Sequence, residues 1–290
     1  MRLMRVGAPG AERPAVWTED GRLLDLSPVT DTIDGAFLAA DGIRRAAAAL
    51  ATGELSEAAP PEAIAPGGVL RVGAPIARPG KVVCIGLNYR DHARETGTPP
   101  PERPVVFMKD PGTVVGPRDP VLIPRGSVKT DWEVELAVVI GRRARYLESA
   151  EEAREVIAGY AISNDVSERE FQLEHSPQWD LGKSCETFNP LGPWLVTADA
   201  IPDPQNLRLR LRVNGVLRQD GHTSDMIFPV AEIVARLSRY MVLEPGDVIN
   251  TGTPAGVALG LPGTPYLRPG DVVEPEIEGL GTQRQVFAAA

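Results

Sequence analysis

The sequence has few of the residues on which several protein classes depend. It contains only two cysteines, Cys84 and Cys185, and three histidines, too few for a disulfide scaffold or a cysteine-rich zinc array. We expect both cysteines to be reduced thiols in a cytoplasmic protein. No run of about 18 apolar residues is present, and the first residues lack the apolar core of a secretory signal. The sequence therefore predicts a cytoplasmic protein without a membrane span.

Basic residues are also in deficit. The chain has 39 acidic and 30 basic residues, which gives a formal net charge of −9. An acidic surface repels phosphate backbones, so we expect no nucleic-acid partner. Glycine and proline, by contrast, are abundant, with 29 and 28 of the 290 residues. This composition favours many turns and short strands over a helical bundle.

Two regions of different character follow each other along the chain. In residues 1–70, the pair Asp20-Gly21 predicts a hairpin turn, and residues 41–54 predict a helix. Residues 58–68 are rich in proline, alanine and glycine and are typical of a linker. We therefore expect a small N-terminal α+β domain at 1–70 and a larger domain at 71–290.

The larger region alternates apolar and polar residues in short stretches. Such alternation predicts strands, and Asn214-Gly215 is a strong hairpin signal. Helical spacing occurs in residues 149–160, which begin with a capping box, and in residues 229–241. Sheet with few helices predicts a β-rich α+β fold of sandwich or barrel type. The predicted strands are 82–86, 133–140, 194–197, 207–213, 247–250 and 271–279.

Glu133 and Glu135 lie two residues apart on one predicted strand and so share a face. Two carboxylates this close repel each other, and a bound cation resolves the conflict. A solvated edge strand is the ordinary alternative, but Ala137 and Val139 continue the same face as an apolar surface. Asp165, at the end of the next apolar run, is a third candidate ligand. Ligand sets made only of oxygen favour Mg²⁺, Mn²⁺ or Ca²⁺ over Zn²⁺.

His92 and Glu95 form a second candidate group, one turn apart if this segment is helical. A carboxylate beside an imidazole raises its basicity, as a general base requires, although an exposed His–Glu pair is the alternative. Lys183 lies in a largely uncharged segment, where a buried ammonium needs a partner; a surface lysine is the alternative. The segment 250–254 offers backbone amides to a ligand anion, or is only a turn.

Six short segments occur in a fixed order, namely IGLNYRDHARE, FMKDPGTVVGP, KTDWEVELAVVIG, GYAISNDVSERE, QWDLGKSCETFNPLGPW and TGTP. Together they resemble the fumarylacetoacetate hydrolase family, and most of all its bacterial branch of 2,4-diketo-3-deoxy-sugar-acid hydrolases and acylpyruvases. The resemblance runs from about Lys81 to the C-terminus. The N-terminal region resembles the small leading domain of this branch less specifically.

This resemblance implies a catalytic domain of the family's mixed β-sandwich and β-roll type, a homodimer, and one Mg²⁺ or Mn²⁺ per subunit. It also assigns roles to nine residues through the family's motifs. By these motifs Glu133, Glu135 and Asp165 are the metal ligands, His92, Glu95 and Lys183 are the catalytic groups, and Lys109, Gln172 and Thr253 contact substrate.

The activity that the resemblance implies is metal-dependent hydrolysis of a carbon–carbon bond, of the EC 3.7.1 type. The substrate would be a 2,4-dioxo acid, either an acylpyruvate or a diketo-deoxy sugar acid, and the products pyruvate and a carboxylic acid. The same site suits oxaloacetate decarboxylation or keto–enol isomerisation, and this branch is often named for ureidoglycolate lyase. A non-catalytic binding module and a purely structural Ca²⁺ site are disfavoured because ligands, dyad and lysine are all present.

Overall fold

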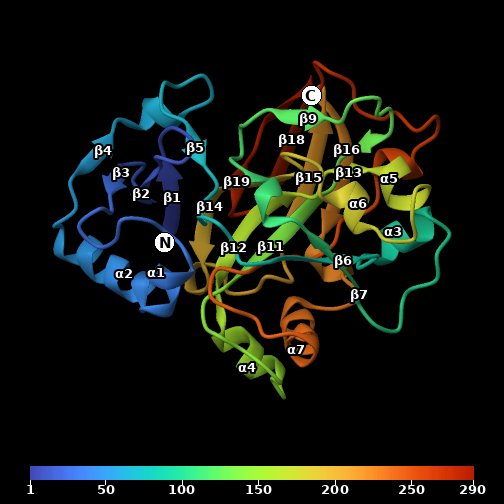
Figure 1. Ribbon diagram of the computed structural model, residues 1–290. Helices are drawn as coiled ribbons and strands as arrows, with labels where there is room; N and C mark the ends of the chain where they lie inside the picture. The colour runs from blue at the N-terminus through green and yellow to red at the C-terminus, as the bar shows by residue number, and fades with distance from the viewer.

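The computed structural model describes all 290 residues, and most of its regular structure is sheet (Figure 1). The strands form a twelve-stranded sheet, a six-stranded sheet and a two-stranded ribbon. The strands are β1 (Arg2–Val6), β2 (Arg13–Trp17), β3 (Leu23–Asp25), β4 (Glu57–Ala59), β5 (Val72–Gly73), β6 (Val82–Gly86), β7 (Val105–Lys109), β8 (Val114–Val115), β9 (Val121–Ile123), β10 (Thr130–Asp131), β11 (Val134–Ile140), β12 (Ile157–Asn164), β13 (Ser167–Glu168), β14 (Asn189–Thr197), β15 (Arg208–Val213), β16 (Val216–His222), β17 (Val248–Asn250), β18 (Val272–Ile277), β19 (Gly281–Thr282) and β20 (Gln285–Ala289).

Helices are short and few, as the sequence predicts. None of them combines the length and the apolar character that a membrane crossing requires. The α-helices are α1 (Gly35–Ala39), α2 (Gly42–Thr52), α3 (Arg90–Glu95), α4 (Ala150–Glu155), α5 (Arg169–Leu173), α6 (Asp180–Lys183) and α7 (Val230–Tyr240), and the 3-10 turns are η1 (Pro61–Ile64), η2 (Pro111–Thr113), η3 (Ala198–Ala200), η4 (Thr223–Asp225) and η5 (Ala258–Gly260).

Strand β11 lies in the interior of the large sheet, whose order is β4-β3-β2-β1-β14-β12-β11-β17-β6-β7. Every residue of β11 is buried, so both of its faces pack against core. The even-numbered side chains, Leu136 among them, join a core formed with the six-stranded sheet and helix α7. Ala137 and Val139 join a second core on the other face. The two faces predicted from the alternation are confirmed.

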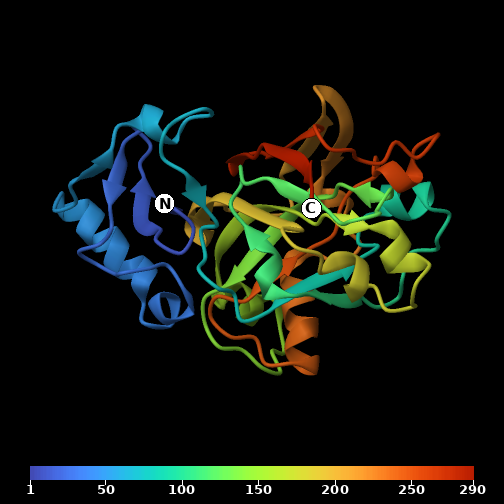
Figure 2. The same ribbon diagram turned by 45° about the horizontal axis from the view of Figure 1, so that its top comes forward.

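The N-terminal residues are built into the same large sheet. Strand β1 pairs antiparallel with β14, with Leu3 opposite Leu195. Leu3, Leu195 and Val139 belong to one hydrophobic cluster, which continues from the N-terminal unit to the centre of the sheet. Figure 2 shows the N-terminal unit, in blue, beside the rest of the chain with β14 at the junction. Part of the segment predicted as a linker is ordered as β4 and η1.

The structure corrects one helix prediction and confirms several other elements. Helix α4 begins at the predicted Ser149 cap, whose hydroxyl accepts a hydrogen bond from Glu152 N, but it ends at Glu155. Ile157 and Tyr160, predicted on its apolar face, lie in β12 instead, paired with β11. Pairing on both sides outweighs helical spacing in a segment this apolar. The hairpin at Asn214-Gly215 and helix α7 occur as predicted.

Because Leu3 is fully buried in a shared core, we predict that Leu3→Ala destabilises the whole chain, by about 3 kcal/mol. Urea unfolding followed by far-ultraviolet circular dichroism and by tryptophan fluorescence should give one common transition at lower urea. The matched control is Val69→Ala, because Val69 is 96% exposed and its truncation should leave the midpoint unchanged. Separate transitions for the two probes would contradict a shared core.

Candidate active site

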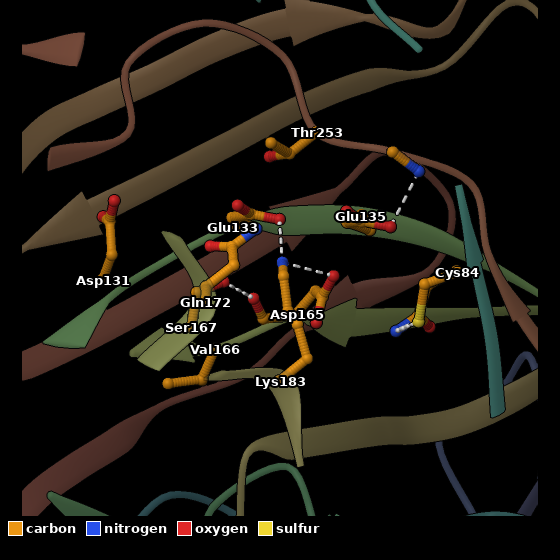
Figure 3. Close-up of polar contacts among 12 residues, drawn as sticks. Cys84, Asp131, Glu133, Glu135, Asp165, Val166, Ser167, Gln172, Lys183 and Thr253 are labelled. Atoms are coloured by element: carbon orange, nitrogen blue, oxygen red, sulfur yellow. Dashed lines mark hydrogen bonds and ion pairs between the residues drawn. The ribbon is translucent and has the colours of Figure 1, made fainter. Parts of the chain in front are cut away.

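The two glutamates lie at the beginning of strand β11. Glu133 directly precedes β11 and Glu135 lies within it, on the same face as Ala137. Asp165 follows β12, which pairs antiparallel with β11, and its backbone N–H donates to Glu133 O at 2.9 Å. The three carboxylates are buried, and one oxygen atom of each lies within 4.8 Å of the others. Figure 3 shows them around the tip of Lys183.

Electrostatics distinguish the two glutamates. Burial raises the pKa of Glu135 well above its usual value, and Asp165 and Glu133 raise it further. Burial alone would raise the pKa of Glu133 as well, but Lys183 and Arg169 outweigh it and hold the pKa of Glu133 at about 2. The two glutamates therefore differ, because Glu133 has cationic partners and Glu135 has none.

The donor set fits a hard divalent cation. Glu135 forms no ion pair, and its Oε2 accepts only the backbone N–H of Gly252 at 2.7 Å. A buried carboxylate without a cation is costly, and a divalent ion between Glu133, Glu135 and Asp165 would remove that cost. All the donors are oxygens, which suits Mg²⁺ or Mn²⁺ rather than Zn²⁺.

Two buried lysines neutralise Asp165 from opposite oxygens. Lys183, in α6, places its Nζ 2.8 Å from Asp165 Oδ2 and 2.9 Å from Glu133 Oε2. Lys109, at the end of β7, places its Nζ 2.5 Å from Asp165 Oδ1 and 2.9 Å from Val166 O. Both lysines are 1% exposed, so Lys183 is not the surface lysine considered as an alternative.

Helix α3 carries the His–Glu pair. His92 Nδ1 lies 3.1 Å from Glu95 Oε2, and His92 is buried. Glu95 Oε1 accepts the backbone N–H of Gly256 at 2.9 Å, so this carboxylate is fixed on both oxygens. A carboxylate opposite Nδ1 favours the tautomer with a proton on Nδ1, which leaves Nε2 as the basic nitrogen.

The candidate residues meet at one cavity of about 210 Å³. Thr253 is anchored there by a hydrogen bond from its Oγ1 to Val134 O at 2.9 Å. Asp165, Glu95 and Lys109 do not line the cavity. Glu95 contacts His92 and Asp165 contacts Lys183, both of which line it, and Lys109 contacts Asp165. The predicted site residues that line the cavity are His92, Glu133, Glu135, Gln172, Lys183 and Thr253.

Two residues of the site have no role in the sequence prediction. Asp131 is fully buried and binds Arg169 through its Oδ2, 2.8 Å from the guanidinium Nε. Arg169 Nη2 in turn lies 2.7 Å from Glu133 Oε1, so Asp131 holds Glu133 in place through Arg169. Strand parity could have indicated Asp131, because it precedes Glu133 by two residues as Glu133 precedes Glu135.

The segment after β17 binds carboxylates of the protein rather than only offering amides to a ligand. Besides Gly252 and Gly256, the backbone N–H of Ala258 donates to Asp131 Oδ1 at 2.7 Å. Gly252 has a φ of 101°, a left-handed value that glycine adopts without strain. This segment therefore orients one candidate ligand, the dyad glutamate and Asp131.

Buried ionisable groups with strongly shifted pKa values, gathered at a cavity, are typical of an enzyme active site. The sequence model for the C-terminal domain of fumarylacetoacetate (FAA) hydrolase matches residues 81–288. The chain therefore belongs to the fumarylacetoacetate hydrolase family, as its motifs indicate, and it has the β-rich α+β fold of that family.

Similar proteins span the whole chain. A Burkholderia multivorans protein named "Putative hydrolase" is 49% identical over 291 residues, covering 100% of both chains. The crystal structure of 2-hydroxyhepta-2,4-diene-1,7-dioate isomerase from Mycobacterium marinum is 33% identical, covers 100% of this chain and 98% of its own, and has a TM-score of 0.74. The maleylpyruvate hydrolase from Sphingobium sp. SYK-6, in complex with manganese(II) and pyruvate, is 28% identical with full coverage of both chains and a TM-score of 0.80.

We predict that Arg169→Met destabilises the metal-free protein by about 3–5 kcal/mol, because it leaves Asp131 and Glu133 buried without their shared cation. Urea unfolding in EDTA measures the change. Arg154→Met is the matched control, since the Arg154 side chain is 63% exposed and pairs only with Glu151 on the surface. Equal losses in the two variants would contradict a structural role for the Arg169 ion pairs.

Glu135 should also make the stability of the metal-free protein depend on pH. Because its folded pKa lies above the ordinary value of 4.5, the folded chain binds a proton that the unfolded chain has released. Stability should therefore fall as pH rises above 4.5, by at most about 1.4 kcal/mol per unit for this group. Glu133, whose folded pKa is about 2, changes the stability only between pH about 2 and 4.5, which is below the pH range in which Glu135 acts.

The measurement is urea unfolding in EDTA at several pH values above 4.5, for the parent protein and for Glu135→Gln. The glutamine variant keeps the size of the side chain and removes the titrating group, so the fall in stability with pH should be smaller in this variant. An identical pH dependence in both proteins would show that Glu135 ionises in the folded state as it does in the unfolded chain.

Proposed function

We propose that this protein is a divalent-metal-dependent hydrolase that cleaves a carbon–carbon bond in a 2,4-dioxo acid, giving pyruvate and a carboxylic acid. One observation carries the proposal: three buried carboxylates suited to a divalent ion and a carboxylate-supported histidine line or border the same cavity. The names of the similar hydrolases and the manganese and pyruvate in one of their structures support it.

His92 is the general base in this proposal. With its Nδ1 facing Glu95, its Nε2 can take a proton from a water molecule, and the oxygen of that water adds to the C4 carbonyl carbon. The bond between C3 and C4 then breaks, C4 leaves as the carboxylic acid, and the electron pair remains on C3. The His92 imidazolium returns its proton to C3, which gives pyruvate and restores the base. Glu95 stabilises the imidazolium and is itself held by Gly256 N–H.

Lys183 is the proposed cationic partner of the reacting oxygens. Its ammonium is fully buried, and Asp165 and Glu133 raise its pKa despite burial, so it stays charged at neutral pH. A fixed ammonium stabilises negative charge that develops on a substrate oxygen. A divalent ion held by Glu133, Glu135 and Asp165 would supply Lewis-acid polarisation of the 2-oxo group. We propose Gln172 and Thr253 as substrate contacts and Lys109 as a support for Asp165.

Isomerisation of a keto–enol pair is the second candidate. The similar Mycobacterium marinum protein is named an isomerase of a dioate, and proton transfer between carbon and oxygen needs the same base without addition of water. The two activities differ in their products, because only hydrolysis or decarboxylation releases pyruvate.

We predict that the Mg²⁺-loaded protein releases pyruvate from a short acylpyruvate and that EDTA abolishes the release. His92→Ala should lower kcat by about 10²–10⁴-fold, the usual contribution of a general base. A coupled assay for pyruvate measures both effects, with oxaloacetate as the parallel substrate. His222→Ala is the matched control, because His222 lies outside the cavity and should keep full activity.

Near-normal turnover by metal-loaded His92→Ala would contradict the assignment of the base. Pyruvate from oxaloacetate alone would make decarboxylation the activity of this site, and isomerisation without pyruvate release would favour the second candidate.

A further inference from the structure

The lining of the cavity has two chemically different parts. The first, called here the charged end, comprises the carboxylates, Lys183 and Arg169. The second, called here the apolar wall, has the hydroxyls of Thr96 and Thr98 and the side-chain amide of Gln172 as its polar neighbours. The apolar wall is formed by Leu87, Phe107, Leu173, Trp179 and Leu259. A substrate whose oxo-acid head occupies the charged end extends its tail along this wall.

The aromatic part of the wall begins directly beside the charged end. Lys183 Nζ lies 4.9 Å from the centre of the Phe107 ring. The Phe107 and Trp179 rings pack edge to face, with centroids 5.5 Å apart and planes at 61°. Gly86 makes room for the indole, because a Cβ atom at this position would lie 2.4 Å from Trp179 Cζ3. The backbone of β6 therefore fixes where the tail meets an aromatic surface.

No cation is free to receive a second carboxylate at the apolar end. The permanent cations that line the cavity are Arg169 and Lys183. Arg169 pairs with Asp131 and Glu133, and Lys183 pairs with Glu133 and Asp165, all at the charged end. A carboxylate moved from water to an apolar wall without a partner loses its hydration uncompensated. An alkyl or aryl group gains from the same burial.

We propose that this enzyme is specific for monocarboxylic 2-oxo acids with an apolar tail and discriminates against dioates and hydroxyl-rich sugar acids. This inference rests on the proposed function, since it places the oxo-acid head at the carboxylate cluster. It selects the acylpyruvates from the two substrate groups that the family motifs suggest.

The test measures binding, so that it does not depend on turnover. Dissociation constants are determined by isothermal titration calorimetry with the Mg²⁺-loaded protein. The ligands are 2-oxohexanoate, with an alkyl tail, and 2-oxohexanedioate, which has the same chain length and a terminal carboxylate. Pyruvate is the probe without a tail. We expect 2-oxohexanoate to bind at least roughly tenfold more tightly than the dioate and than pyruvate.

Two variants locate the effect. Trp179→Ala should weaken 2-oxohexanoate binding by roughly tenfold and affect pyruvate binding much less, because pyruvate has no tail to pack against the indole. Leu173→Arg should place a cation at the apolar wall and reduce the ratio by which 2-oxohexanoate binds more tightly than 2-oxohexanedioate. Leu181→Arg is its matched control, because Leu181 is 55% exposed, close to the 48% of Leu173, but does not line the cavity.

Equal or tighter binding of the dioate would overturn the proposal, as would undetectable binding of both six-carbon acids or an equal effect of the two arginine variants. These outcomes are separate from failure of the proposed function, which appears as absence of pyruvate release from an acylpyruvate. A protein that shows the tail preference but releases no pyruvate would retain the specificity and lose the proposed reaction.

Discussion

The constraint on which this structure depends is the burial of three carboxylates side by side. Glu133, Glu135 and Asp165 are almost completely removed from water, where like charges repel strongly and desolvation is costly. Much of the surrounding structure offsets this cost in free energy. Two lysines and one arginine reach the cluster from α6, β7 and α5, and each forms its ion pair with a carboxylate oxygen.

The compensation is unequal, and it leaves one carboxylate of the cluster without a cation. Glu133 and Asp165 have fixed cationic partners, whereas Glu135 has one backbone amide. Glu135 is therefore the carboxylate that a bound metal ion would stabilise most. The backbone of the segment after β17 supplies the remaining support, and it ties the carboxylate cluster to the Glu95 of the dyad, so the two halves of the site share one scaffold.

Local sequence patterns predicted the strand that carries the glutamates and the turn that joins His92 to Glu95, because both follow from the period of the backbone. Such local patterns do not predict which strands and side chains pair when they lie far apart in the chain. Ile157 and Tyr160 have helical spacing after a good cap, yet they form a strand because β11 and β14 flank them. The role of Arg169 depends on an ion pair that spans 38 residues to Asp131, which no local pattern contains. The roles that the family motifs assign to the site residues remain proposals.

The pairing of β1 with β14 also affects the order in which the chain can fold during synthesis. One edge of β1 is paired by β2 as soon as the hairpin emerges. On the other edge β5 pairs with Arg5 and Val6, but β14, the partner of Arg2 and Leu3, begins only at Asn189. Until the ribosome has produced β14, the edge of β1 at Arg2 and Leu3 and the apolar side chains around Leu3 lack their final partners. Unpaired edges of this kind attract wrong partners. A nascent chain stalled before β14 should therefore be a substrate for chaperones, although its N-terminal strands have all been made.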